Sequence, residues 1–487
     1  MKMNMRDYLL DNRFIRKYSK LSIVAKASMW FMVCGVLQKG IAVITTPIFT
    51  RLLSTTQYGE FTIFNSWLQI FTIITTFRLD FSVFNKGMSK YPDRRDEYTA
   101  SMQSAMSLLT IAVFIVYLFF SKQINRFTEM STLVTCLMFL ELLFMPAIRV
   151  WTLRQRYDYR YIIVVAVTLG ISIANAVIGV IAVLITENKG FARIVSFVVV
   201  ECVVGSIIYV INLKKGKKLF VSEFVKFAVV FNLPLIPYYF SSYVLAQADR
   251  IMIQKMVGLD KVAIYNLAQS VGLLMTIVTT SLNSALAPWE YQKLSEGKYK
   301  EIPTKFSKIM VIVVVALMLF MAFIPEIVMI LASKEYTEAI YIVPSVTACA
   351  FFMLLSDLFS NVEFYYDKNR FATYLSIGIA VINIILNYIG INLFGYVAAG
   401  YTTLICYTIF GIGHVFYSDY LVKKRLGQYL FKKSEIFLYA GMLIGFAIVM
   451  TFLYSRVVLR YAVILGLATI VFVKRKEVIR ILSEIKK

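Results

Sequence analysis

The chain is poor in charged residues, in histidine and in cysteine. Of its 487 residues only 16% are charged, one is histidine and five are cysteine, whereas a soluble globular chain carries about 25% charged residues. A single histidine leaves little scope for metal chemistry with imidazole ligands, so neither a metal nor a cofactor is expected. The cysteines all lie within apolar runs, which favours small buried hydrophobes over a disulfide framework or zinc site; they are Cys34, Cys136, Cys202, Cys349 and Cys406.

Hydrophobic residues are correspondingly abundant. They account for 59% of the chain, and the mean hydropathy is +0.72, so a soluble fold of this length could not hide the apolar surface from water. The same composition excludes disordered and collagenous chains. Because a helical span needs roughly 20 residues, we expect an all-α integral membrane protein with about 14 transmembrane helices. The net charge of +23 then reflects Lys and Arg in cytoplasmic loops, and no nucleic acid partner is expected.

Apolar runs of spanning length recur along the whole chain. We place the spans at residues 26–50, 60–85, 98–120, 130–151, 161–185, 191–212, 227–250, 262–287, 307–333, 340–362, 371–394, 396–421, 435–453 and 457–473. Lys and Arg in alternate connections divide 38 to 11, with Lys39 and Arg78 inside spans. This bias predicts that both termini are cytoplasmic. The charged, amphipathic segment before the first span does not have the form of a cleavable signal.

Two segments six spans apart resemble each other. Residues 51–85 align without a gap with residues 255–289, and the best match sets residues 72–76 (TIITT) against residues 276–280 (TIVTT). Six intervening spans give both copies the same membrane direction, as in the parallel repeats of transporters, where the substrate path lies between the halves. We therefore expect a cytoplasmic amphipathic N-terminal segment, two parallel-related six-helix lobes, and two C-terminal helices with a basic cytoplasmic tail: residues 1–25, 26–218, 219–428 and 429–487.

Motifs in two of the spans carry a family resemblance. The first span ends in Pro47-Ile48-Phe49-Thr50-Arg51-Leu52-Leu53-Ser54, followed by Tyr58-Gly59. The seventh carries Leu233-Pro234 and Ala248-Asp249-Arg250-Ile251-Met252-Ile253, followed by Ala263-Ile264-Tyr265. These motifs resemble those of Wzx-type polysaccharide repeat-unit flippases, the oligosaccharide flippase or polysaccharide transporter family of the MOP (multidrug/oligosaccharidyl-lipid/polysaccharide) exporter superfamily. Ala263 departs from the pattern, because the family usually has glycine there.

This resemblance implies a function. Such a flippase moves an undecaprenyl-diphosphate-linked oligosaccharide repeat unit, for capsule, O-antigen or exopolysaccharide, across the bacterial plasma (inner) membrane by alternating access, and it is not an enzyme. The implied partners are the lipid-linked oligosaccharide, the membrane and other polysaccharide-assembly membrane proteins. Two alternatives stay open. One is a MATE-like multidrug or cation antiporter, which usually has twelve spans; the other is a polytopic polysaccharide polymerase, which normally needs a long outer loop.

Ionisable residues at membrane depth mark candidate sites, because each is costly unless it is paired or hydrated. Lys39 lies roughly 20 Å into the first span, at 1.5 Å per residue. It could attract the diphosphate as a point charge; the alternative is an ion pair with Glu141 or Glu201. Arg78 could bind substrate in the same cavity or snorkel to the headgroups. It could also pair locally, although Asp80, two residues away, points elsewhere on the helix.

The remaining candidates lie mostly in the seventh span. Tyr239, Tyr243 and Gln247 offer aromatic and amide groups suited to sugars, although packing explains each of them as well. Pro234 and Pro237 are expected to kink this span. Candidates for a coupling ion or for ion pairs are Glu141, Glu201 and Asp357. An inter-helix structural role is expected for the family-motif residues Pro47, Arg51, Gly59, Pro234, Asp249 and Arg250.

Overall fold

The helices of the chain follow the predicted spans. The computed structural model describes residues 18, 21–368, 370–427, 432–475 and 480, and within these residues every regular element is a helix. Twelve helical stretches of this part are long and apolar enough to cross a membrane. The chain is therefore an all-α, multi-pass membrane protein, as predicted. Most of the amphipathic segment 1–25 and of the basic tail lies outside the described residues.

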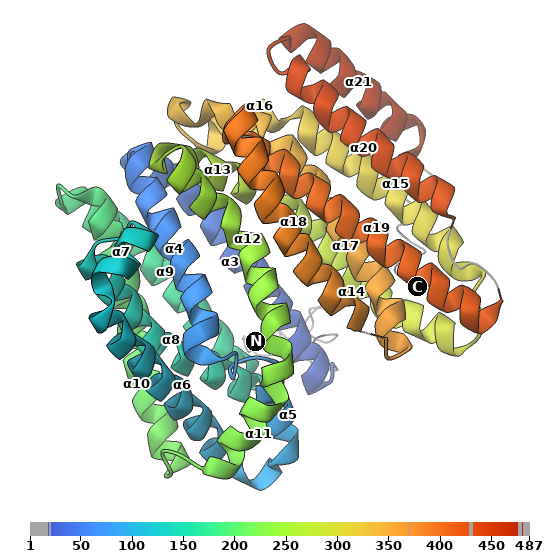
Figure 1. The fold of residues 1–487 in the computed structure, drawn as a ribbon. Coiled ribbons are helices and arrows are strands. Elements are labelled where there is room, and N and C mark those ends of the chain that lie inside the picture. The colour runs from blue at the N-terminus through green and yellow to red at the C-terminus, as the bar shows by residue number, and fades with distance from the viewer. Residues whose placement is uncertain (1–17, 19–20, 369, 428–431, 476–479, 481–487) are drawn as a thin grey trace, which may run out of the picture. The chain divides into compact units, whose positions relative to one another are not determined.

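Two compact units divide the chain. Unit 1 contains Met1–Leu53 and Trp67–Ile236, and unit 2 contains Ser54–Ser66 and Pro237–Lys487. The helices of unit 1 are α3 (Ile23–Leu52), α5 (Ser82–Lys90), α6 (Arg95–Phe119), α7 (Ser121–Thr128), α8 (Thr132–Tyr157), α9 (Tyr161–Ile185), α10 (Lys189–Gly216) and α11 (Ser222–Asn232), with α4 (Thr55–Thr76) divided between the units (Figure 1). Those of unit 2 are α12 (Ile236–Met256), α13 (Leu259–Gly272), α14 (Leu274–Ser295), α15 (Glu301–Ala322), α16 (Ile324–Leu331), α17 (Val343–Tyr365), α18 (Arg370–Phe394), α19 (Ala398–Leu426), α20 (Lys433–Leu453) and α21 (Val457–Val473).

Each of the fourteen predicted spans has a helical counterpart in the described part of the chain. Two counterparts, α4 and α21, are not among the twelve long apolar stretches. The first turns of α4 are polar, and α21 has only 17 residues. The seventh and eighth spans each consist of two helices in succession, α11 with α12 and α13 with α14.

Unit 1 is built around α8 and α10. These two helices pack along each other, α6 contacts both, and α9 contacts α10 and α3. An aromatic core lies where α5, α6 and α11 meet. The fully buried ring of Tyr98 lies 5.6 Å from that of Phe84 and 5.4 Å from that of Phe224, centroid to centroid.

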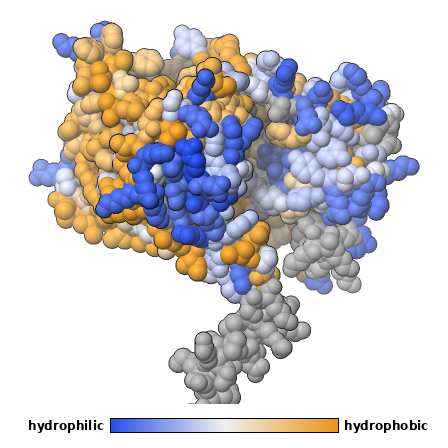
Figure 2. Space-filling model, turned by 90° about the horizontal axis from the view of Figure 1, so that it is seen from below, coloured by the Kyte–Doolittle hydropathy of each residue, from blue (hydrophilic) through white to orange (hydrophobic). Residues whose placement is uncertain are grey.

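A row of cations on aromatic rings joins α5 to α11. Three cationic groups lie over three phenyl rings of α11, Lys86 over Phe231 at 4.5 Å, Lys90 over Phe227 at 4.0 Å and Arg94 over Phe224 at 4.5 Å. Such contacts contribute about 0.5–1 kcal/mol each at exposed sites. Figure 2 looks onto the end of the molecule where α5 and α11 lie in Figure 1, and shows hydrophilic side chains gathered there with hydrophobic ones around them. The three contacts between cations and aromatic rings hold α11 on unit 1.

Unit 2 is built around α17, which is the most completely buried of the candidate spans in the described residues. It packs against α13, α14, α15, α19 and α20. The helices α20 and α21, which follow the twelve spans of the predicted lobes, both pack on α15 and lie beside it in Figure 1. The outer helices carry many exposed Ile, Leu, Val and Phe side chains, which suits a surface that faces lipid.

The predicted repeat is visible in two helix corners. The first helix of the repeat ends at Leu52 and the next begins at Thr55; in the second copy these positions are Met256 and Leu259. Both pairs are 204 residues apart, the offset of the sequence alignment. Within unit 2 the N-terminal turns of α4 and α13 touch so closely that a Cβ on Gly59 would lie 2.1 Å from the carbonyl oxygen of Leu259. Only glycine fits there without displacing backbone.

The predicted continuous helix at 60–85 is wrong after Thr76. The backbone of Phe77 and Arg78 turns into the left-handed region, with φ of 48° and 52°, before α5 begins at Ser82. The amide of Asn232, 154 residues later than Arg78, donates hydrogen bonds to the carbonyls of Phe77 and Arg78 at 2.9 and 2.8 Å. A tertiary contact thus satisfies the backbone groups that the helix gives up.

The seventh span is interrupted, as its two prolines predict. α11 ends at Asn232, a 3₁₀ turn covers Leu233–Leu235, and α12 begins at Ile236. Pro234 and Pro237 lack the amide hydrogens that a continuous helix needs. In the chain, this interruption coincides with the boundary between unit 1 and unit 2, which lies between Ile236 and Pro237.

Candidate functional site

Two buried arginine contacts converge on one carboxylate in unit 1. Asp80 Oδ2 accepts a hydrogen bond of 2.9 Å from Arg149 Nη1 of α8, and Asp80 Oδ1 lies 3.8 Å from Arg78 Nη1. The prediction that Asp80 points away from Arg78 is wrong, because both residues lie in the turn after α4 and not on a helix. Arg78 and Asp80 are buried, and Arg149 is half-buried. Two guanidinium groups thus share one carboxylate, and we call Arg78, Asp80 and Arg149 the cation cluster.

Arg149 is a member that sequence reasoning missed. It lies two residues before the predicted end of the fourth span and was therefore grouped with the loop cations. The turn of the chain at Phe77–Phe81, which brings Asp80 to it, has no local sequence signal. A charge near a span end gives a pattern typical of snorkelling, so only the fold could show the contact.

The two buried glutamates of unit 1 lie on neighbouring helices. Glu141 of α8 is almost fully buried, and its Oε2 has no hydrogen-bond partner within the described residues. Glu201 of α10 accepts a hydrogen bond of 3.1 Å from Asn175 Nδ2 of α9. Both carboxylates are close enough to Arg149 to feel its charge. They therefore share their electrostatic surroundings with the cation cluster.

Lys39 stands apart from these groups. It is exposed on α3, and it makes no ion pair with any residue that the structure describes. Neither Glu141 nor Glu201 is its partner, so the predicted alternative of an ion pair is not seen. Its neighbour Gln38 contacts Ser172 of α9 at 3.4 Å. The amino group of Lys39 is thus available to a ligand.

The family-motif acid of the seventh span, Asp249, connects four helices of unit 2. Its buried carboxylate accepts hydrogen bonds from Tyr265 of α13, from Asn387 Nδ2 of α18 at 2.5 Å and from Thr403 Oγ1 of α19 at 2.9 Å. Thr402 in turn donates to Asn387 Oδ1. Every donor in this set is a neutral hydroxyl or amide group. Sequence reasoning found Asp249 but not its partners, which lie up to 154 residues away.

A cavity of about 150 Å³ opens beside this network. Its polar lining includes Gln247, Arg250, Gln269 and Thr403, and its apolar lining includes Met353 and Leu273. Arg250 is held by Asn266 Oδ1 at 3.0 Å and by the Ala246 carbonyl at 2.8 Å. The predicted sugar-binding residue Gln247 therefore lines a cavity. Tyr239, buried, and Tyr243, half-buried, lie on the same helix outside the lining.

The other motif residues lie at helix ends. Arg51 Nη1 donates to the Pro47 carbonyl at 3.0 Å within the last turns of α3, Gly59 lies at the close contact of α4 with α13, and Pro234 lies in the 3₁₀ turn. Asp357 is half-buried on α17, where His414 is its neighbouring ionisable group.

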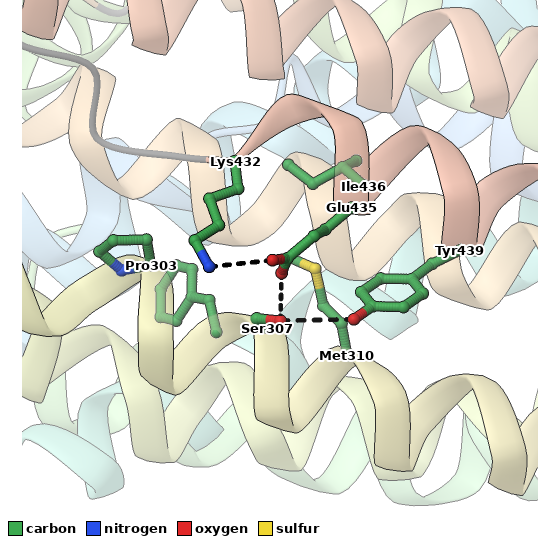
Figure 3. A pocket seen from close by; sticks show the side chains of 8 residues that line it. Pro303, Ser307, Met310, Lys432, Glu435, Ile436 and Tyr439 are labelled. Atoms are coloured by element: carbon green, nitrogen blue, oxygen red, sulfur yellow. Dashed lines mark hydrogen bonds and ion pairs between the residues drawn. The ribbon is translucent and has the colours of Figure 1, made fainter.

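A third polar cluster fastens α20 to α15 (Figure 3). Glu435 accepts hydrogen bonds from Lys432 Nζ at 3.0 Å and from Ser307, whose hydroxyl also lies 3.3 Å from that of Tyr439. The space between these side chains is only about 10 Å³, about the room that one water molecule needs. This cluster is a structural tether and not a ligand site.

These features define a class of protein. A multi-pass helical fold that buries arginine, glutamate and aspartate, and that has a mixed polar cavity in unit 2, has the construction of a membrane transporter. Comparison with known families makes this assignment specific. The chain belongs to the family described as "Polysaccharide biosynthesis protein" (Polysacc_synt), whose model matches residues 24–294, more than half of the sequence. The MatE family model matches residues 234–389.

Solved structures share the fold. A structure of "Lipid II flippase MurJ, inward closed conformation" matches with a TM-score of 0.66 and 13% identity, over 92% of this chain and 100% of that one. An inward-facing multidrug resistance MATE family transporter of the MOP superfamily matches with a TM-score of 0.56 and 14% identity, over 80% and 96% of the two chains. A MATE in complex with MaL6 matches with a TM-score of 0.53 and 13% identity, over 82% and 96%. No curated protein matches the sequence.

Proposed function

We propose that this protein is a flippase that moves an undecaprenyl-diphosphate-linked oligosaccharide repeat unit, destined for a capsule, O-antigen or exopolysaccharide, across the bacterial plasma membrane. The family match to polysaccharide biosynthesis proteins supports a glycan-related substrate. The fold match to a lipid II flippase covers more of this chain than the matches to multidrug transporters, 92% against 80%. Both kinds of match favour a transporter over an enzyme.

The observation that carries the proposal is the set of three cationic side chains of unit 1, Lys39, Arg78 and Arg149. Arg78 and Arg149 share Asp80, and Lys39 is exposed without an ion pair among the described residues. A diphosphate is a compact polyanion, and guanidinium and ammonium groups are its usual protein ligands. We assign Lys39 and Arg78 to substrate binding and add Arg149 to them.

Unit 2 supplies the groups that suit sugars. Gln247 lines the cavity beside Asp249, and Tyr239 and Tyr243 lie on the same helix. Amides and aromatic faces bind sugar hydroxyls and ring C–H groups without needing charge. In this scheme the lobe of residues 26–218 holds the diphosphate, and the lobe of residues 219–428 contacts the oligosaccharide.

Alternating access would use the interruption of the seventh span. α11 is held on unit 1 by its row of cations and by Asn232, whereas α12 is held in unit 2 by Asp249. The 3₁₀ turn at Leu233–Leu235 lies between these two anchors, which is where a change of backbone angles costs least. Glu141 and Glu201 remain candidates for a coupling ion on unit 1.

We also propose the topology and setting that the charge bias predicts. Both termini would face the cytoplasm, and the protein would work beside other membrane proteins of polysaccharide assembly. The second candidate function is a MATE-like antiporter, which the MatE model match at residues 234–389 favours.

A transport assay separates the two functions. Full-length protein in proteoliposomes would be given a fluorescent undecaprenyl-diphosphate-linked oligosaccharide, with flipping measured by reduction of the dye on the outer leaflet, and in parallel ethidium, with uptake measured by fluorescence. We expect lipid flipping at least about tenfold above empty vesicles and no ethidium transport. Ethidium transport without lipid flipping would establish the antiporter instead.

A further inference from the structure

The single histidine of the chain lies in a buried pair in unit 2. His414 of α19 is 1% exposed and Glu363 of α17 is 0% exposed, and His414 Nδ1 lies 2.7 Å from Glu363 Oε1. The Ser418 hydroxyl, which donates to the Phe359 carbonyl at 2.7 Å, lies 3.2 Å from the same carboxylate oxygen. The two titratable side chains therefore meet inside the unit and are shielded from solvent.

The surroundings of this pair are aromatic on one side. The rings of Phe410 and Phe371 meet the imidazole at nearly right angles, with centroids 4.8 and 5.9 Å away. Tyr417 of α19 stacks on Phe371 of α18 at 4.0 Å and is close enough to Glu363 to feel its charge.

Charged groups approach the pair from two further directions. Asp357 lies on α17 and interacts electrostatically with His414; its carboxylate accepts no hydrogen bond within the described residues. One position beyond Ser418, the buried Asp419 is paired with Lys433 Nζ of α20 at 2.6 Å. Asp419 therefore has an ion-pair partner, whereas Asp357 has none within the described residues.

The number of protons bound by the pair determines its net charge. A hydrogen bond between an imidazole nitrogen and a carboxylate oxygen needs a proton between them, so the pair holds at least one proton. With one proton its net charge is −1, and with two it is neutral. Glu363 Oε2 has no hydrogen-bond partner among the described residues, and a buried charge that lacks hydrogen bonds is costly. A second proton would neutralise the pair inside the unit, whereas contact with water would solvate its negative charge.

The packing of α17 against α19 does not require titratable side chains. Elsewhere in unit 2, neutral side chains join neighbouring helices, such as Asn383 Nδ2 to Thr403 Oγ1 at 3.3 Å and Ser241 to Ser376 at 3.3 Å. Unlike these neutral pairs, a Glu–His pair can also bind and release a proton.

We propose that Glu363 and His414 together form a proton-binding site, through which unit 2 couples transport to the proton gradient. The coupling part rests on the proposed flippase function; proton binding itself does not. One proton is taken from water on one side of the membrane, held between carboxylate and imidazole, and returned to water on the other side. Only O–H and N–H bonds form and break, and no electrons are transferred.

The single histidine makes the site directly observable. In full-length protein labelled with ¹⁵N-histidine and reconstituted in nanodiscs, the imidazole signals belong to His414 alone and can be followed from pH 5 to pH 9. We expect the titration midpoint of His414 to move to lower pH by about one unit or more in Glu363→Gln, because the carboxylate that favours the imidazolium is gone. Asp357→Asn, which removes a charge without breaking a hydrogen bond of the pair, should shift the midpoint less and in the same direction.

Tyr420→Phe is the matched control, since Tyr420 is exposed on the same helix. A midpoint in Glu363→Gln and Asp357→Asn that equals that of Tyr420→Phe would overturn the proton site. If Glu363→Gln does not fold, Asp357→Asn still decides.

Coupling is tested in proteoliposomes with the fluorescent lipid-linked oligosaccharide. An imposed pH gradient should accelerate flipping by the native protein at least about threefold, and His414→Gln should flip at its gradient-free rate under all conditions. An equal response of His414→Gln and the native protein would overturn the coupling. If the native protein flips nothing, the proposed function fails, while the histidine titration still decides the proton site.

Discussion

At the scale of single residues, the buried carboxylates of unit 1 and unit 2 differ in their partners. Asp80 is shared by two arginines, Arg78 and Arg149. Asp249 instead accepts hydrogen bonds from three neutral side chains. Substitutions of such residues are expected to reduce substrate binding in unit 1 and to reduce stability in unit 2.

Replacing Lys39 tests the binding role. We expect Lys39→Ala to reduce repeat-unit export at least about tenfold with normal protein abundance, and Lys39→Arg to retain a substantial part, because the charge is kept. Export is measured as surface polysaccharide in cells that depend on this protein. Since Lys39 has no carboxylate partner in the described residues, the doubles with Glu141→Gln and Glu201→Gln should not recover. Recovery in either double would mean that Lys39 only neutralises a buried acid.

Removal of the Asp249 carboxylate should act on stability. Asp249→Ala leaves the donors of Tyr265, Asn387 and Thr403 without their acceptor, and each buried group left unpaired costs about 1–3 kcal/mol. We expect the free energy of unfolding to fall by about 3 kcal/mol or more, and by less in Asp249→Asn, which keeps one acceptor oxygen. Unfolding of the purified protein in detergent measures both, with the exposed Glu187→Ala as control. Equal stability of all three variants would contradict the network.

At the scale of helices, local sequence determined where helices form, but distant contacts determined where they stop. Each of the fourteen apolar runs located a helical stretch, and twelve stretches of the described residues are long and apolar enough to cross a membrane. The end of α4 at Thr76 could not be read from residues 60–85, because the amide that caps the broken backbone belongs to Asn232. The interruption at Leu233–Leu235 could be read, because its cause is local, two prolines that cannot donate a hydrogen bond.

The same distinction holds for the site. Lys39, Glu141 and Asp249 were recognisable because a charge within an apolar run stands out. Arg149, Asn387 and Thr403 were not, since polar residues near helix ends and neutral residues within spans are common and gain their meaning only from what they contact.

The close contact of α4 with α13 predicts that two glycine-to-alanine substitutions have different effects on stability. Gly59→Ala would place a methyl group 2.1 Å from the Leu259 carbonyl oxygen, and such overpacking typically costs about 1–3 kcal/mol. Gly35 of α3 has nothing within 4 Å of its would-be Cβ, so Gly35→Ala should gain up to about 1 kcal/mol of helix propensity. Thermal unfolding should therefore shift down for the first and up or not at all for the second. A stabilised Gly59→Ala would show that the helices do not approach so closely.

Removing the interruption of the seventh span should lower the rate of flipping without lowering the stability of the protein. Pro234→Ala with Pro237→Ala allows α11 and α12 to form one continuous helix. We expect the double variant to unfold at the same or a higher temperature and to flip substrate at least about fivefold more slowly, because the flexible point is lost. The proteoliposome assay measures the rate, with Pro303→Ala at the start of α15 as control. An unchanged rate would place the moving point elsewhere.

At the scale of the whole molecule, the charge bias of the connections predicts the direction of insertion. In a cysteine-free background, Cys at position 187, between α9 and α10, should react with an impermeant maleimide from outside intact cells. Cys at position 298, between α14 and α15, should react only after the cells are opened. Both native residues, Glu187 and Lys298, are exposed, so labelling reports sidedness and not burial. The reverse pattern would overturn the assignment of cytoplasmic termini.

The division of α4 between the two units has a consequence for biosynthesis. Residues 54–66 pack with partners that are translated much later, such as Leu259 against Gly59 and Tyr336, whose ring meets that of Tyr58 at 6.2 Å. At roughly 5–20 residues per second, a ribosome needs on the order of 15–55 s to travel from position 58 to position 336. For that time the start of α4 is in the membrane without its partners. All residues of unit 1 have been translated by position 236, whereas the start of α4 must wait in the nascent chain until the rest of unit 2 is synthesised.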